Sequence, residues 1–324
     1  MKIFTQNKVS SFLLLILLIL LLCKTTFAQQ PNGKYTIVIH GGAGSINPNI
    51  DETEKQSYLN SLTTALNMGK EILEKGGSSL DAVEQVIRFL EDDSLFNAGR
   101  GAVFTSAGTV ELDASIMDGR DLSSGAVAGV TIIKNPISLA RLVLEKTEHV
   151  LFAGKGADEL GKQLGVEIVE PKYFFVQKRF ESLKKMMEKT KGTVGCVAID
   201  RFGNIAAGTS TGGMTGKMPG RVGDSPLINA GTYANNKTCG VSGTGIGELF
   251  IRNTVAFNIS ALMEYKDYLL EEAANEMIFN RLPKDAGGII AVDKDYNYTF
   301  KYNTSSMLRG VANSEGLFEV NIWK

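Results

Sequence analysis

The sequence predicts an α+β fold, a four-layer αββα sandwich in which two mainly antiparallel sheets pack face to face and helices cover both outer faces. Two observations favour this class. Apolar residues follow a helical period early in the chain and again over 248–282, whereas β-branched, strand-like runs fill the middle and return near the end. Because every sheet must bury a face against another layer, helices, strands, strands and helices in this order fit two packed sheets with helices outside.

The amino-terminal half begins with a buried strand. The run 35–40 is β-branched and aromatic and leads into a glycine-rich turn at 41–44. An amphipathic helix over about 58–73 follows, and Gly76-Gly77 ends it. A second helix is expected to start at a capping box over Ser78–Asp81. The next expected elements are strands at Thr109–Met117 and Gly125–Ile133 and helices at about Ile137–Lys146 and Gly154–Leu164.

The second half opens with a charged segment, Pro171–Lys191, which reads as a solvated linker with some helical character. It ends at Gly192, after which the pattern returns to strands. The predicted elements are strands at Val194–Asp200, Asn204–Thr211 and Thr238–Ser242, a helical region at Glu248–Leu282, and a closing strand pair at Gly288–Val292 and Tyr298–Tyr302.

Composition excludes some function classes. The chain has 324 residues, 44% of them hydrophobic, which is enough for a well-buried core. Its 34 basic and 35 acidic residues give a net charge of −1. Binding to nucleic acid or to an anionic membrane needs a clustered positive excess, so we expect no nucleic-acid partner. Small charged substrates remain compatible with this balance.

The first 28 residues resemble a cleaved secretory signal. Lys2 and Lys8 precede an apolar run over 12–22, and Ala28 is a small residue at its exit. A spanning helix needs roughly 20 apolar residues. An uncleaved anchor is the alternative, and Cys23 offers a lipoprotein alternative, although small residues do not precede it. All three predict export, to the periplasm or outside the cell. The other cysteines, Cys196 and Cys239, lie in strand-like runs and are expected to be buried thiols rather than a disulfide.

Two familiar motifs are excluded. Gly208-Thr209-Ser210-Thr211-Gly212 matches the serine nucleophile elbow, but that chemistry needs a histidine after the serine, and both His40 and His149 precede it. The stretch 156–162 matches part of a P-loop, but Gln163 stands where magnesium needs Ser or Thr.

Thr193 offers a different nucleophile. A threonine hydroxyl attacks poorly unless a base lies beside it, and its own α-amino group becomes that base once Gly192-Thr193 is cut. An α-amine has a pKa of about 7.7 to 8.0, so a useful neutral fraction exists near neutral pH. The glycine before it tolerates the strained backbone that self-cleavage needs. From composition alone, a strand-capping threonine without chemistry is the simpler interpretation.

A set of motifs occurs in order along the chain: His40-Gly41-Gly42-Ala43-Gly44, Leu95-Phe96-Asn97-Ala98-Gly99, Glu111-Leu112-Asp113-Ala114, Gly192-Thr193-Val194-Gly195, Thr209 to Met214, Gly220 to Pro226 and Gly243-Thr244-Gly245. By these motifs the chain, from Tyr35 nearly to the carboxyl terminus, resembles the plant-type asparaginase and isoaspartyl peptidase family of N-terminal nucleophile hydrolases. Related glycosylasparaginases carry asparagine where this chain has Gly212.

The resemblance implies a role for each matching residue. Thr193 would be the nucleophile for both self-cleavage and catalysis, and Thr211 would hydrogen-bond it and assist proton transfer. Thr244, through its hydroxyl, and Gly245, through its backbone N–H, would form the oxyanion hole, where each donor is worth roughly 3 to 4 kcal/mol. The zwitterionic head of the substrate would be held by Arg221 on its carboxylate and by Asp224 and the carbonyl of Gly247 on its ammonium. For Arg221 and Asp224, a local surface ion pair is the alternative.

The family also implies a structural sodium ion held by backbone carbonyls, and no cofactor for the chemistry itself. Asn97 would stabilise the active-site side of the same loop, the alternative being a local turn bond. The matching carbonyls are those of Leu90, Glu91, Asp93, Phe96, Ala98 and Arg100.

The sequence therefore predicts a signal peptide, 1–28, and one domain, 29–324, that cuts itself between Gly192 and Thr193 into an α chain, 29–192, and a β chain, 193–324. The expected substrates are isoaspartyl dipeptides and L-asparagine, with L-aspartate released, and the expected assembly is a homodimer of cleaved αβ units. The alternatives are a glycosylasparaginase or a periplasmic amino-acid-binding protein. The stretch 303–309 departs from the family pattern near the pocket, which leaves substrate preference open.

Overall fold

The computed structural model describes residues 33–44, 46, 49–185 and 192–323. The predicted signal peptide and Cys23 lie outside these residues. Among the helices within them, none combines the length and the apolar character that crossing a membrane requires.

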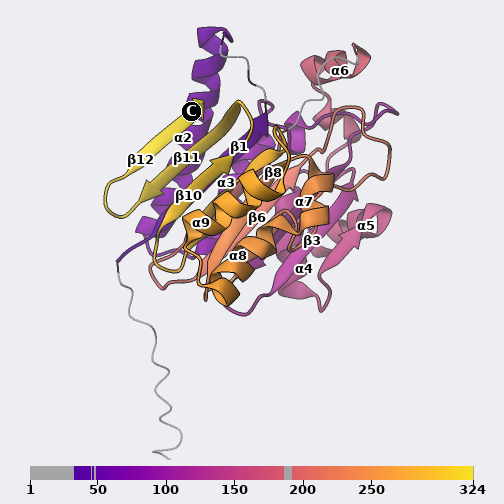
Figure 1. Ribbon diagram of the computed structural model, residues 1–324. Coiled ribbons are helices and arrows are strands. Elements are labelled where there is room, and N and C mark those ends of the chain that lie inside the picture. Colours follow the sequence, from indigo (N-terminus) through magenta and orange to yellow (C-terminus); the bar gives the residue numbers. More distant parts are fainter. Residues whose placement is uncertain (1–32, 45, 47–48, 186–191, 324) are drawn as a thin grey trace, which may run out of the picture. The chain divides into compact units, whose positions relative to one another are not determined.

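A large sheet forms the centre of the described chain (Figure 1). Its neighbouring strands are antiparallel except β3 and β4, which run parallel. The strand order is β12 (Phe318–Trp323), β11 (Ser306–Asn313), β1 (Thr36–Gly44), β5 (Val194–Ile199), β6 (Ile205–Thr211), β2 (Leu112–Asp118), β3 (Ser124–Val130) and β4 (Leu151–Ala153).

A smaller antiparallel sheet packs on one face of the large one. β8 contacts β5 and β6, and β9 contacts β1 and β5, so the two sheets share an apolar layer that includes Val38, Val197, Val241 and Ile290. Burial of these side chains drives the face-to-face packing. The order is β10 (Tyr298–Tyr302), β9 (Gly287–Asp293), β8 (Cys239–Gly245) and β7 (Thr232–Ala234).

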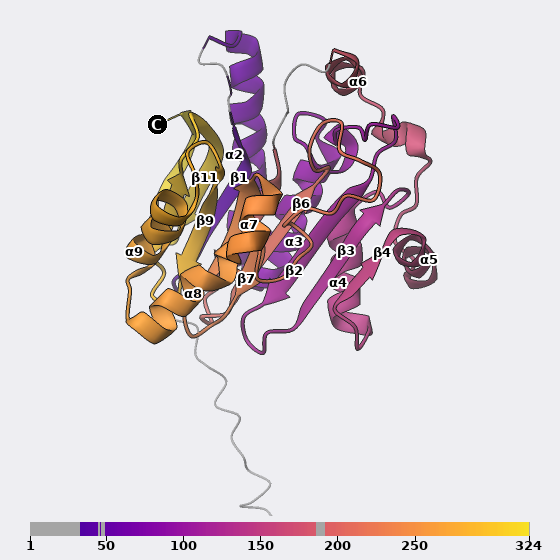
Figure 2. The same ribbon diagram turned by 45° about the vertical axis from the view of Figure 1, so that its right-hand side comes forward.

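Helices cover the outer face of each sheet (Figures 1 and 2). On the large sheet, α2 (Glu52–Glu74) packs on β1 and β11, α3 (Ser79–Asp92) on β5 and β6, and α4 (Pro136–Lys146) on β2 and β3. α5 (Gly154–Leu164) contacts β3 and β4. On the small sheet, α8 (Val255–Lys266) packs on β7 and β8, and α9 (Leu270–Asn275) on β9 and β10. The predicted αββα class is confirmed.

Local signals place several boundaries as expected. The Ser78 hydroxyl accepts a hydrogen bond from the Asp81 N–H at 3.1 Å, which caps α3. Gly76, with φ of 82°, follows the end of α2. The predicted helical region at 248–282 is broken into α7 (Gly247–Asn253), α8, α9 and a π-helix (Glu276–Arg281), because Thr254 and Asp267 adopt left-handed backbone angles. Cys196 and Cys239 are free and buried, as predicted.

Two predictions were wrong. The strand pair ending at Tyr302 does not complete the chain, because β11 and β12 follow, and β11 pairs with β1, joining Thr36 to Asn313. The segment from Pro171 is also not simply a solvated linker. A 3-10 turn (Pro171–Phe174) and α6 (Gln177–Lys184) lie in it, and Phe174 is fully buried in the core. Its last residues, 186–191, lie outside the described part.

Candidate active site

Thr193 lies one residue before β5 and faces the end of β6. Because Val194 pairs with Ser210 in an antiparallel register, the next position along brings Thr193 to Thr211. The Thr193 hydroxyl donates a hydrogen bond to Thr211 Oγ1 at 3.2 Å. Both side chains are almost fully buried, at 6% and 3% exposure. The sheet register therefore brings the predicted nucleophile to its predicted partner.

The Gly192 carbonyl, on the bond expected to break, accepts two hydrogen bonds. The Asn97 amide Nδ2 donates to it at 2.8 Å, and the Thr211 hydroxyl at 3.1 Å. Each threonine hydroxyl carries one proton, so the bonds have one consistent direction, from Thr193 to Thr211 and from Thr211 to the carbonyl. Two donors on a carbonyl oxygen stabilise negative charge that develops there.

The end of β1 approaches the same peptide closely. Gly42 has φ of 116°, and a Cβ at that position would lie 3.0 Å from Gly192 Cα and 3.3 Å from Thr193 N. Only glycine fits both the backbone angle and the space. The neighbouring Ala43 N–H donates to Thr244 Oγ1 at 3.1 Å, which places Thr244 one residue along β1 from this contact.

His40 supports Thr193 from the other side, a role that sequence reasoning missed. Its Nδ1 lies 3.0 Å from the Thr193 carbonyl oxygen and must donate, so Nε2 accepts from the Ser242 hydroxyl, also at 3.0 Å. Burial lowers the pKa of His40 to about 3, so the ring is neutral at physiological pH. The position of His40 directly before the predicted glycine turn was the available signal. The Ser210 hydroxyl donates to Glu91 Oε1 at 2.6 Å and not to a histidine, so the serine-elbow alternative lacks the base that it needs.

Arg221, Asp224 and Gly247 come together, as predicted. A Cβ at Gly247 would lie 2.8 Å from Asp224 Oδ1 and 3.0 Å from Arg221 Nη2. A Cβ at Gly213 would lie 3.3 Å from Arg221 Nη1. The carbonyl of Gly213 accepts a hydrogen bond from the Asn97 amide at 2.7 Å. Gly213 therefore lies between Arg221, expected to bind the substrate, and Asn97, which donates to the carbonyl next to Thr193.

Arg221 and Asp224 do not form the surface ion pair that was the alternative. Arg221 Nε and Nη2 donate to Glu248 Oε1 at 3.0 and 2.9 Å, and sequence reasoning missed Glu248, although it directly follows the glycine turn. Asp224 is 5% exposed, and its Oδ2 has no hydrogen-bond partner within the described residues. Burial raises the pKa of Asp224 to about 7. A buried, unpaired carboxyl oxygen beside a guanidinium suits a zwitterionic ligand.

Gly245 follows Thr244 at the end of β8 with φ of 152°. A Cβ there would overlap the Ala286 carbonyl oxygen and would lie 2.6 Å from Gly287 Cα, so only glycine fits where β8 meets β9. The hydroxyl of Thr244 accepts from Ala43 and keeps its own proton for a second partner.

The loop expected to hold sodium is closed tightly at two glycines, Gly99 and Gly101. The carbonyl oxygen of Glu91 would overlap a Cβ at Gly99, and that of Phe96 would overlap a Cβ at Gly101. Residues with side chains therefore could not close this loop. The described residues contain no cluster of three or more His, Cys, Asp or Glu side chains able to hold a metal. A cation here would rest on backbone oxygens, which suits a hard monovalent ion.

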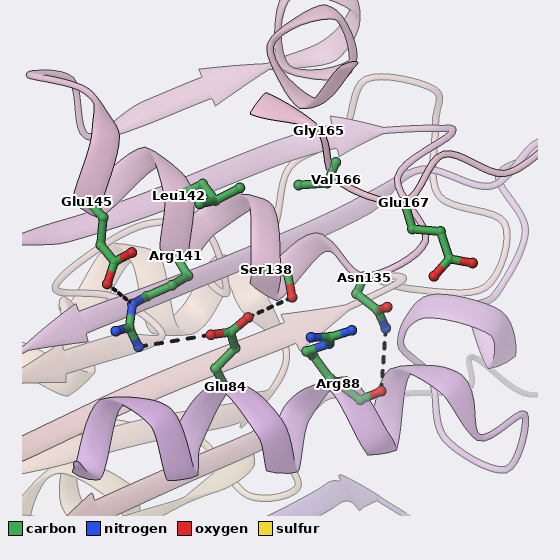
Figure 3. A pocket seen from close by; sticks show the side chains of 10 residues that line it. All are labelled: Glu84, Arg88, Asn135, Ser138, Arg141, Leu142, Glu145, Gly165, Val166 and Glu167. Carbon is green, nitrogen blue, oxygen red and sulfur yellow. Dashed lines mark hydrogen bonds and ion pairs between the residues drawn. The ribbon is translucent and has the colours of Figure 1, made fainter. Parts of the chain in front are cut away.

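A hollow of about 330 Å³ lies elsewhere, between α3 and α4 (Figure 3). Arg141 pairs there with Glu145 at 2.6 Å and with Glu84 at 3.9 Å, and the Ser138 hydroxyl donates to Glu84 at 2.7 Å. The predicted site residues do not line it.

Residues 33–322 match the protein family described as asparaginase. This chain belongs to the asparaginase family. It is 46% identical to the isoaspartyl peptidase of Escherichia coli (strain K12), over 86% of this chain and 92% of that protein. It is 40% identical to the isoaspartyl peptidase/L-asparaginase of Bos taurus, over 84% of this chain and 91% of that protein. It is 39% identical to the plant-type L-asparaginase of Pyrobaculum calidifontis, over 85% of this chain and 96% of that protein. The family predicted from the motifs is confirmed.

The asparaginase match spans both sides of Gly192-Thr193. In the stretch 303–309, which departs from the family pattern, residues 303–305 connect β10 to β11 and residues 306–309 begin β11. There the Ser306 hydroxyl accepts from Ile46 N–H at 2.9 Å and donates to the Gly44 carbonyl. This departure therefore anchors the carboxyl end of β1, the strand that carries Gly42.

Proposed function

We propose that this chain is an amidohydrolase of isoaspartyl dipeptides and L-asparagine, and that it becomes active by cutting its own Gly192-Thr193 bond. The observation that carries the proposal is the directed pair of hydrogen bonds from Thr193 to Thr211 and from Thr211 to the Gly192 carbonyl. A nucleophile and a polarised carbonyl are held by the same hydroxyl.

Self-cleavage follows from this arrangement. Thr193 Oγ1 attacks the Gly192 carbonyl carbon, and Asn97 and Thr211 stabilise the charge on its oxygen. The hydroxyl proton passes through Thr211 to the Thr193 nitrogen as the C–N bond breaks, which leaves an ester between Gly192 and Thr193. Water hydrolyses this ester, giving a Gly192 carboxylate and a free Thr193 α-amine.

The free α-amine then serves as the base for substrate. Arg221 binds the α-carboxylate of the substrate and ionised Asp224 binds its ammonium. Thr193 Oγ1 attacks the side-chain amide carbon while the α-amine accepts the hydroxyl proton and passes it to the leaving amine. The Thr244 hydroxyl and the Gly245 N–H are the oxyanion donors. Water attacks the resulting β-aspartyl ester and releases L-aspartate.

A panel of three substrates tests this function in the self-cleaved protein. The substrates are L-asparagine, β-aspartyl-leucine and a glycosylated asparagine. The products measured are ammonia, leucine and aspartate, respectively. We expect turnover of the first two. Turnover of the third alone would make the protein a glycosylasparaginase. Saturable asparagine binding by an intact chain, without turnover of any, would make it a binding protein.

We further propose a sodium ion in the loop from Leu90 to Arg100, a homodimer of cleaved αβ units, and export directed by residues 1–28. The residue pattern and the tight closure of the loop at Gly99 and Gly101 support the ion, which would fix the loop that carries Asn97. Only the residue pattern supports export. Symmetric dimers are the commonest oligomers, which supports the assembly.

A further inference from the structure

Arg179 bridges the two ends of the loop that carries Asn97. It lies in α6, in the segment that precedes the cleavage point. Its Nε donates to the Gly101 carbonyl and its Nη2 to the Leu95 carbonyl, both at 2.9 Å. One guanidinium thus fixes both ends of the loop from Leu95 to Gly101.

The surrounding segment is packed, which holds the guanidinium in place. The Phe104 ring meets the rings of Phe175 and Phe180 edge to face, at 5.7 and 5.5 Å between centroids. The guanidinium of Arg100, on the loop, lies 5.7 Å from the ring of Tyr173. These contacts pack the segment against the loop and against Phe104, just after it.

Asn97, between the two pinned ends, has every side-chain bond that the cleavage proposal needs. Its Oδ1 accepts from Val103 N–H at 3.0 Å, while Nδ2 donates to the Gly192 and Gly213 carbonyls. The geometry points to Arg179 as a positioning residue for self-cleavage, which keeps the Asn97 amide on the Gly192 carbonyl. This inference rests on the proposed self-cleavage.

The side chain must be arginine for this task. A planar guanidinium donates in two fixed directions at once, whereas a lysine ammonium is a single point charge. Its partners here are neutral carbonyls. Those of Leu95 and Gly101 are also distinct from the six carbonyls expected to hold sodium, so the two cations would fix the same loop through separate oxygens.

The first test is the rate of precursor cleavage, followed by intact mass. Lys178→Ala is the matched control, because Lys178 lies in the same helix and its side chain, within the described residues, makes only an exposed pair with Glu54 at 2.7 Å. We expect Arg179→Ala and Arg179→Lys to slow cleavage about tenfold or more, because displacing the Asn97 amide gives up part of what an oriented donor to the reacting carbonyl supplies, and we expect Lys178→Ala to match wild type. Guanidinium chloride at low, non-denaturing concentration should restore part of the rate to Arg179→Ala, and urea at the same concentration should not. Wild-type cleavage in both Arg179 variants would overturn the inference.

A second test does not depend on cleavage. In a Thr193→Ala background, hydrogen exchange of peptides spanning 94–104 should be faster with Arg179→Ala than with Lys178→Ala. Unchanged exchange would overturn the role of Arg179. If wild-type protein never cuts itself, the proposed self-cleavage fails, while this exchange result still decides whether Arg179 holds the loop. Arg179→Lys serves in both tests if Arg179→Ala does not fold.

Discussion

Arg221 is paired with Glu248 and not with Asp224. Both contacting nitrogens of Arg221 meet the same oxygen, Glu248 Oε1, and the Glu248 side chain is 45% exposed whereas that of Arg221 is 17% exposed. A substrate carboxylate must therefore compete with Glu248 for the guanidinium.

Replacing Glu248 with Gln should tighten substrate binding. The neutral amide keeps a hydrogen-bonding oxygen but removes the competing charge, so we expect KM for L-asparagine to fall about twofold to fivefold with kcat within a factor of two, a change within the range for partly exposed ion pairs. Steady-state kinetics measure both constants. Arg221→Lys is the comparison and should raise KM, since the fork geometry is lost. A higher KM in Glu248→Gln would show that Glu248 orients Arg221 rather than competing for it.

Substrate binding should weaken below neutral pH because of Asp224. Burial first, then nearby Glu248 and Asp113, raise the pKa of this carboxyl to about 7, against the lowering effect of Arg221. Below that pH the carboxyl is neutral and cannot hold an ammonium, so kcat/KM should fall up to about tenfold per pH unit. In Asp224→Asn, kcat/KM should be low at every pH, and the fall in kcat/KM that protonation of Asp224 causes should be absent. An unchanged acid limb in this variant would assign the limb to the Thr193 α-amine alone.

Acid should destabilise the fold through His40. Burial lowers the pKa of His40 from 6.5 to about 3. The unfolded chain therefore takes up a proton below pH 6.5 that the folded chain refuses, and stability is lost as pH falls from about 6.5 towards 3, by at most about 1.4 kcal/mol per pH unit. Above pH 6.5 this contribution is constant.

The check is urea unfolding at pH 7 and pH 5 in a Thr193→Ala background. His40→Asn is the variant, because its amide nitrogen occupies the place of Nδ1, the donor to the Thr193 carbonyl. The free energy of unfolding should fall less between the two pH values in His40→Asn than in the parent. Equal falls would mean that another group carries the acid sensitivity.

Thr211→Val should slow self-cleavage by about a hundredfold. The change keeps the shape but removes the oxygen that accepts from Thr193 and donates to the Gly192 carbonyl, a loss typical of positioned proton-transfer groups. Thr211→Ser keeps the hydroxyl and should cleave within about threefold of wild type. Intact mass over time gives both rates. If valine and serine behave alike, the hydroxyl at this position has no part in cleavage.

The elements that could be predicted from the sequence are those whose own residue pattern shows which side is buried. α3 has an apolar stripe and a serine cap, and β5 is a continuous apolar run, so each could be placed without knowing its neighbours. β11 could not be placed in the same way. It contains Arg309 and Gly310, and its position depends on pairing with β1 at the opposite end of the chain.

The site divides in the same way. Thr193, Thr211 and the residues expected to bind the substrate could be predicted from motifs, because glycine turns fix their local geometry. Arg179 and Glu248 could not be found by sequence reasoning, since their partners are backbone oxygens and a side chain on distant loops. Charged residues look alike in the sequence until the fold shows which atoms each one contacts.

The most direct test of Thr193 as nucleophile is the intact mass of purified protein lacking residues 1–28, incubated at neutral pH beside a Thr193→Ala variant. Two chains that meet at Gly192 and Thr193 are predicted for the wild type, with a single chain for Thr193→Ala. A single persistent chain in both proteins, or the same two chains in both, would contradict self-cleavage by the Thr193 hydroxyl.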